Sequence, residues 1–161
     1  MATRSTIALE YANGTVQQVY CHWDGYLDHN GKILLNNWSD PFKLQQLIEL
    51  GTVSSLSTDV GTQHPFNNPH TYGTAAYGAH EADHKHMTTF YTRDRGEDLH
   101  VNTFKDFEDY KRNHQYEEFE YILRNVDNVP TWFVCTYETD GYEVLTDVME
   151  RVAREIAEEE E

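Results

Sequence analysis

The chain is poor in cysteine and in long apolar runs, and each shortage excludes a class of protein. Its two cysteines, Cys21 and Cys135, lie far apart and are flanked by strand-like residues, which favours two buried, reduced thiols over a disulfide. No apolar run approaches the ~18 residues of a membrane span, and no signal-peptide core follows the N-terminus. We therefore expect a soluble, cytoplasmic protein without a membrane partner.

Motifs for nucleotides and nucleic acids are missing as well. The sequence has no G-x-x-x-x-G-K-[ST] or G-x-G-x-x-G loop, no cysteine pairs at zinc-ribbon spacing and no basic patch interleaved with aromatic residues. We therefore expect no cofactor, no catalytic residues and no direct contact with nucleic acid. Oligomeric state is left open by these observations.

Basic residues are scarce, so the chain is strongly acidic. It carries 28 acidic and 12 basic residues, a formal net charge of −16. Residues 1–93 contribute −3 and residues 94–161 contribute −13. A field of this sign repels nucleic acid and anionic lipid and attracts basic surfaces or divalent cations. The composition therefore predicts a positively charged partner.

Two β-hairpins are predicted from strand runs separated by turn residues. Residues 6–11 and 15–23 are separated by Ala12-Asn13-Gly14, and Asn-Gly is a strong hairpin signal because both residues tolerate a positive φ. Residues 118–124 and 131–138 form the second pair, with a turn expected at 126–130.

Three helices are predicted between and after these hairpins. Asp40 is a suitable N-cap for a helix over residues 42–50, and residues 104–114 form a second candidate. The third is C-terminal and amphipathic, with its apolar residues at helical spacing: Leu145, Val148, Met149, Val152, Ala153 and Ile156. Residues 158–161 are an acidic tail that we expect to fray from its end.

These elements together predict one α+β domain over residues 1–161. It contains two antiparallel β-hairpins, a mid-chain helix pair and a C-terminal amphipathic helix. Residues 52–86 are rich in Ser, Thr, Gly, Asn, Pro and His and predict a long polar loop. A short strand is expected over residues 87–91.

One motif inside this loop suggests a metal site. His80-Glu81-Ala82-Asp83-His84 matches H-E-x-x-H, in which two histidines hold zinc and the glutamate acts as general base, and His86 follows closely. Nearby glycines and the absence of an apolar stripe argue against the ligand-bearing helix that this chemistry needs. A small metal-dependent hydrolase built on His80, Glu81 and His84 is therefore an alternative, with adventitious binding by His80, His84 and His86 as a weaker form.

The acidic residues themselves are the other candidate site. Carboxylates one helical turn apart stand roughly 6 Å from each other, close to the spacing of phosphates along a DNA strand. A row of them can therefore imitate nucleic acid, although such charges can also serve only for solubility. The candidate partner-binding residues are Asp106, Asp109, Glu117, Glu118, Glu120, Glu158 and Glu159. We read Glu118 and Glu120 as the outward, polar face of a strand.

Four stretches of the chain form a recognisable set: residues 5–10, 19–26 and 92–97 and the hairpin from residue 117 to residue 132. Together they resemble a family of small acidic proteins of tailed phages, mostly uncharacterised, some of which are labelled RNA polymerase inhibitor. The resemblance implies a phage-encoded protein that acts on its host, and it carries over no catalytic residues. Together with the charge it suggests an inhibitor of a basic host protein in the bacterial cytoplasm: an RNA polymerase, a nuclease or a defence complex. An inhibitor that acts through its loop rather than its charge is a further alternative.

Overall fold

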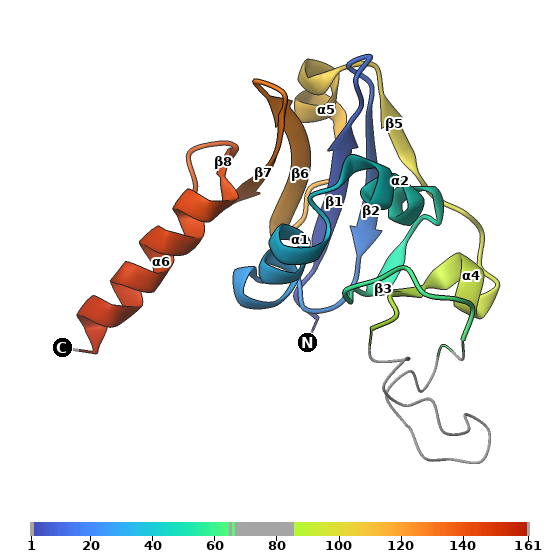
Figure 1. The fold of residues 1–161 in the computed structure, drawn as a ribbon, viewed down its shortest axis with the longest axis horizontal. Coiled ribbons are helices and arrows are strands. Elements are labelled where there is room, and N and C mark those ends of the chain that lie inside the picture. Colours follow the sequence, from blue (N-terminus) through green and yellow to red (C-terminus); the bar gives the residue numbers. More distant parts are fainter. Residues whose placement is uncertain (1, 65, 67–85, 161) are drawn as a thin grey trace, which may run out of the picture.

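The protein is built around one mixed β-sheet (Figure 1), in a computed structural model that describes residues 2–64, 66 and 86–160. The sheet has eight strands in the order β4-β3-β2-β1-β6-β7-β8, with β5 pairing with β2 beside β3. Its strands are β1 (Ser5–Glu10), β2 (Val16–Cys21), β3 (Val53–Ser55), β4 (Thr89–Phe90), β5 (Asn102–Phe104), β6 (Phe119–Val126), β7 (Val129–Thr136) and β8 (Glu143–Val144). An α+β architecture is therefore confirmed.

Both predicted hairpins are present. Strands β1 and β2 are antiparallel, and Gly14 in the turn between them has a φ of 92°. The turn between β6 and β7 is tighter than expected: Asp127 and Asn128 have φ values of 51° and 67°, as a two-residue hairpin turn requires. Pro130 therefore lies inside β7, opposite Asn125, rather than in the turn.

A parallel pairing that local sequence patterns do not indicate joins the two hairpins. Strand β1 runs parallel to β6, with Ser5 opposite Phe119 and Leu9 opposite Leu123. The chain therefore forms a continuous sheet, whose first strand is central, instead of two separate hairpins.

Helices cover both faces of this sheet, so the predicted mid-chain helix pair is wrong. The helix α2 buries Leu44 in one core cluster, and α5 buries Tyr110 in another. Successive strand residues point to opposite faces, and Ile7 belongs to the first cluster whereas Ala8 belongs to the second. The helical elements are η1 (Leu27–Gly31, a π-helix), α1 (Lys32–Asn37), α2 (Pro41–Glu49), α4 (Tyr91–Arg95), α5 (Phe107–Asn113) and α6 (Leu145–Glu159).

Local chemistry accounts for where two of these helices begin. Asp40 accepts a hydrogen bond from the Phe42 amide at the start of α2, as predicted. Asp106 caps α5 in the same way, so α5 begins at Phe107 and Phe104 belongs to β5. The expected helix over residues 104–114 is therefore correct only for its later part.

The predicted loop over residues 52–86 is only partly a loop. Val53–Ser55 forms β3, because Val53 pairs with Cys21 and Phe90. The buried carboxylate of Asp94 accepts hydrogen bonds from the amides of His64 and Phe90, and so holds the two stretches on either side of the undescribed residues together.

The C-terminal helix α6 is confirmed and is longer than the three turns expected. It leaves the sheet after β8 and projects away from it (Figure 1), packing chiefly against β7 and β8. Among the residues that the structure describes, no helix is long and apolar enough to cross a membrane.

Candidate functional site

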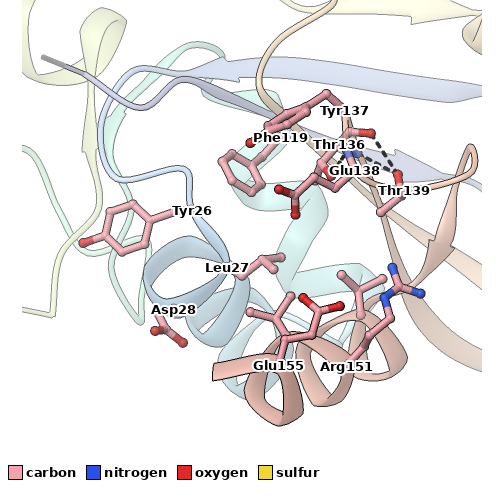
Figure 2. Close-up of a pocket in the computed structure, with 12 residues that line it drawn as sticks. Tyr26, Leu27, Asp28, Phe119, Thr136, Tyr137, Glu138, Thr139, Arg151 and Glu155 are labelled. Atoms are coloured by element: carbon pink, nitrogen blue, oxygen red, sulfur yellow. Dashed lines mark hydrogen bonds between the residues drawn. The ribbon is translucent and has the colours of Figure 1, made fainter. Parts of the chain in front are cut away.

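A groove lies between η1, the end of β7 and α6 (Figure 2). Its volume is about 560 Å³, and Leu27, Phe119, Val148 and Val152 supply apolar surface. The carboxylates of Glu138 and Glu155 point into it, and Asp28 stands on the η1 side. A second hollow of about 440 Å³, lined by Met149 among others, shares Leu27, Asp28 and Val152 with the first. Together they form one groove beside α6, which we call the α6 groove.

The η1 wall is held by close contacts to the sheet. Gly25 approaches β1 so tightly that a Cβ there would lie 2.7 Å from the Cβ of Ser5. The hydroxyl of Tyr121 donates to the carbonyl oxygen of Gly25 over 2.6 Å. Asn30 is buried and donates to the carbonyl oxygen of Trp23 at 3.2 Å. The wall that presents Tyr26 and Leu27 is therefore a fixed part of the fold.

The opposite wall is the turn between β7 and β8. The hydroxyl of Thr139 donates to the carbonyl oxygen of Thr136 at 3.0 Å and accepts from the Thr136 amide at 2.9 Å. This turn holds Tyr137 in solvent with 89% of its surface exposed. The carboxylate of Glu138 raises the pKa of the neighbouring Tyr137 phenol. The turn therefore presents an aromatic ring and a carboxylate next to each other.

The third wall, α6, is only partly covered. Leu145 and Val148 are buried, but Val152 is half-buried and Ile156 is 49% exposed. The helix is anchored in its second turn, where Arg151 pairs with Glu143, and the guanidinium lowers the pKa of that carboxyl. The apolar stripe of α6 thus extends beyond the part of the fold that covers it.

Negative charge is concentrated on this side of the protein. Residues 137–160 carry nine acidic and two basic side chains. The last turn of α6 contains no basic residue, and Glu158 and Glu159 are exposed there. Carboxylates at a helix C-terminus oppose the helix dipole, so helix stability does not account for them.

The predicted acidic residues do not form one continuous surface. Asp106 and Asp109 lie at the start of α5, away from α6 (Figure 1), and both accept backbone hydrogen bonds, from Asp109 and from Lys105 respectively. Glu117 and Glu118 precede β6, whose first residue lies opposite Thr136, so they are at the groove end of the sheet.

Glu120 was expected on a polar outer face, and this is wrong. Its side chain is 7% exposed and pairs with His114, whose side chain is 3% exposed. The hydroxyl of Tyr142 donates to the same carboxylate at 3.1 Å, and its oxygen accepts from the hydroxyl of Tyr110 at 3.1 Å. Because α5 covers this face of the sheet, the polar side chain lies inside a buried network instead of in solvent.

This network contains the residue types of an acid–base site, but its side chains are buried or half-buried instead of facing a groove. Burial opposes the charged form of His114, but the hydrogen bond and charge of Glu120 outweigh it, so the His114 pKa is raised. Burial also raises the pKa of the Tyr110 and Tyr142 phenols. These four side chains bind one another inside the fold, and none of them lines either hollow of the α6 groove.

A second group resembles a nucleophile–histidine–carboxylate arrangement. The Nε2 atom of His64 lies 3.0 Å from the hydroxyl oxygen of Thr89, and its Nδ1 lies 3.7 Å from Oδ1 of Asp94. Thr89 is buried, and Nδ1 of His64 lies closer to the carbonyl oxygen of Thr62, at 2.8 Å. Asp94 binds two amides and the Arg93 guanidinium. The group therefore fastens the chain together and offers no accessible nucleophile.

The predicted metal ligands fall mainly outside the described residues. His80, Glu81 and His84 lie there, whereas His86 is exposed, with Nδ1 at 3.3 Å from the hydroxyl oxygen of Thr58. Within residues 2–64, 66 and 86–160, no three His, Cys, Asp or Glu side chains are arranged to hold a metal ion.

The residues that sequence reasoning missed are those of the α6 groove. Asp28, Tyr26 and Tyr137 were not singled out, and Glu138 was placed at the end of a strand. One signal was available: Thr139, Asp140 and Gly141 are turn formers directly after a strand, and they mark an exposed turn. Nothing local, however, brings η1 to α6.

Comparison with family models, with curated proteins and with solved structures finds no match for this chain.

Proposed function

We propose that this protein is a non-enzymatic inhibitor that binds a basic, nucleic-acid-handling protein of a host bacterium and blocks its nucleic-acid site. The observation that carries the proposal is the acidic C-terminal region, residues 137–160, with nine acidic and two basic side chains on one projecting turn and helix. One of the two cations, Arg151, is already paired with Glu143. A surface of this kind competes with phosphates for Lys and Arg side chains.

The structure changes which residues should be tested. Glu120 is buried, so replacing it would disturb the fold as well as the charge, and the carboxylates of Asp106 and Asp109 are already engaged with backbone amides at the start of α5. Glu138, Glu155, Glu158 and Glu159 are exposed on the projecting region. Changing these four to Gln removes charge at nearly constant shape.

The test is a competition experiment. The partner is first captured from host lysate on the immobilised protein and identified, and its binding to a labelled DNA duplex is then titrated with the protein. We expect displacement of the duplex that weakens steeply with salt, since both ligands compete for one screened site. The four-Gln variant should displace the duplex about tenfold less well.

A matched control is available on the same helix. Arg154→Gln changes charge on the exposed part of α6 in the opposite direction, and should preserve or improve displacement. DNA binding that is unaffected by saturating protein, or displacement that is independent of salt, would contradict the proposal.

A further inference from the structure

The α6 groove combines an uncovered apolar stripe with an acidic rim, and both features bear on what it binds. Val148 is buried against the fold, yet Val152 is half-buried and Ile156 is 49% exposed one and two turns later. A helix of 15 residues gains most of its stability from packing of its apolar face, and this face is only half used. The last two turns of α6 therefore lack the cover that their sequence is suited to.

The shape of the groove indicates an elongated ligand. The two hollows of about 560 and 440 Å³ flank the apolar stripe of α6 and share Leu27 and Val152. They form an open trough between η1 and α6 rather than an enclosed cavity. A second helix laid along α6 would contact both hollows, as in the recognition of amphipathic helices by grooves.

The charges on the rim of the groove determine which charge the bound helix should carry. Asp28, Glu138 and Glu155 line the groove, while the lining cations are already engaged: Arg151 with Glu143, and Lys32 with Asp28 at 3.8 Å. The exposed rings of Tyr26 and Tyr137 stand on the same rim. Carboxylates beside aromatic faces suit Lys and Arg side chains.

We propose that the α6 groove receives a basic amphipathic helix of the partner, with its apolar face against Val152 and Ile156 and its Lys or Arg side chains toward Asp28, Glu138 and Glu155. A second copy of this chain fits less well, since each copy carries a net charge of −16 and the same acidic rim. The inference rests on the proposed function only in taking the partner to be basic.

A synthetic peptide provides the probe. We would use a fluorescein-labelled helix of about 18 residues made of Leu, Ala and Lys, with Leu at positions i, i+3, i+4 and i+7. A second peptide has the same composition in a permuted order that disperses the Leu residues, and a third carries Glu in place of Lys. Fluorescence anisotropy at physiological salt measures binding to the full chain.

We expect the amphipathic basic peptide to bind at least about tenfold more tightly than the permuted or the acidic one. The double variant Val152→Ser/Ile156→Ser should weaken binding about tenfold, because it removes the apolar contact and leaves every charge in place. Ala157→Ser is the matched control, as an exposed residue of α6 that lines neither hollow, and it should change binding less than about twofold. Circular dichroism establishes that each variant is folded.

A second measurement on the parent protein tests the groove without any substitution. Hydrogen exchange of the parent protein should show added protection in both η1 and α6 when the amphipathic peptide binds. Equal binding of the amphipathic and permuted peptides, or no added protection at η1, would overturn the groove proposal while leaving charge-driven inhibition intact. Light scattering that shows a dimer which the double variant abolishes would assign the groove to a second copy instead. Salt-independent competition with DNA, in contrast, would count against the proposed function alone.

Discussion

The guanidinium of Arg151 donates to both carboxylate oxygens of Glu143, with Nη1 3.0 Å from Oε1 and Nη2 3.4 Å from Oε2. Glu143 lies in β8 and Arg151 in the second turn of α6, so this pair ties the projecting helix to the edge of the sheet. The carboxylate also accepts the Asp140 amide at 3.0 Å, which links it to the turn that carries Tyr137. One carboxylate therefore positions two walls of the α6 groove.

Removing this tie should loosen α6. In Arg151→Gln we expect faster hydrogen exchange of the α6 amides with an unchanged sheet, since only Leu145 and Val148 of the helix are fully buried and Met149 and Val152 are partly buried against the core. Arg154→Gln removes the same charge about one helical turn further along α6 and serves as the control. Equal exchange in both variants would show that the Arg151 pair contributes nothing to the position of the helix.

The buried pair of His114 and Glu120 should give stability a particular pH dependence. The His114 pKa in the folded protein is raised above its ordinary 6.5. Between the two values the folded state holds more protons than the unfolded state, so the free energy of unfolding falls as pH rises through this window. Below about pH 6 this contribution is fully present. Chemical denaturation across pH 5–9 measures it.

A variant isolates this pair. In Glu120→Gln the negative slope should flatten, and the free energy of unfolding at pH 6 should fall by about 3–5 kcal/mol, since one member of a buried pair is left uncompensated. Glu117→Gln, a nearby change outside the network, should keep both slope and stability. A slope that survives in Glu120→Gln would assign the pH dependence to another group.

Asp106 distinguishes a capping role from a partner-binding one. Asp106→Asn keeps an oxygen that can accept the Asp109 amide and should leave stability nearly unchanged, whereas Asp106→Ala should lose about 0.5–2 kcal/mol. Thermal unfolding followed by circular dichroism measures both. If Asp106→Asn also reduced inhibition, α5 would belong to the contact surface, contrary to the assignment to α6.

The two cysteines should differ in reactivity. Burial raises the pKa of the Cys21 thiol to about 12, so in the folded protein at pH 8 iodoacetamide should leave it unmodified. Cys135 is half-buried, with a pKa raised by burial and by Glu120, and should react slowly. Mass spectrometry after labelling measures this, and labelling in denaturant, where both should react, is the control.

Prediction from sequence succeeded where short-range chemistry decides the structure. The turn at Asn13-Gly14, the cap at Asp40 and the apolar spacing of α6 each depend on neighbours within a few residues. It failed where distant segments meet: nothing near Ser5 indicates its pairing with Phe119. The burial of Glu120 follows from α5 covering the second face, which the alternation of the strand alone does not reveal.

The candidate site shows the same division. The acidity of the C-terminal region was visible as composition, and Glu158 and Glu159 are exposed as expected. The α6 groove could not be predicted from the sequence, because its walls come from three segments that are separated in the chain: η1, the turn after β7, and α6. Asn30 and Gly31 complete a wide π-helical turn that is stabilised by a buried contact from Asn30 to Ser5 on β1, a partner 25 residues away in the chain.

The parallel pairing of β1 with β6 constrains the order in which the protein can fold during its synthesis on the ribosome. Strand β1 is central in the sheet, yet its second neighbour, β6, begins only at Phe119. Until then β1 has one open edge, and the sheet can close only after a long stretch of chain has been synthesised, a step that is intrinsically slow. Because α6 follows β6, β7 and β8 in the chain, we expect it to dock onto a sheet whose central pairing has already formed, so that the α6 groove takes shape only after β1 and β6 have met.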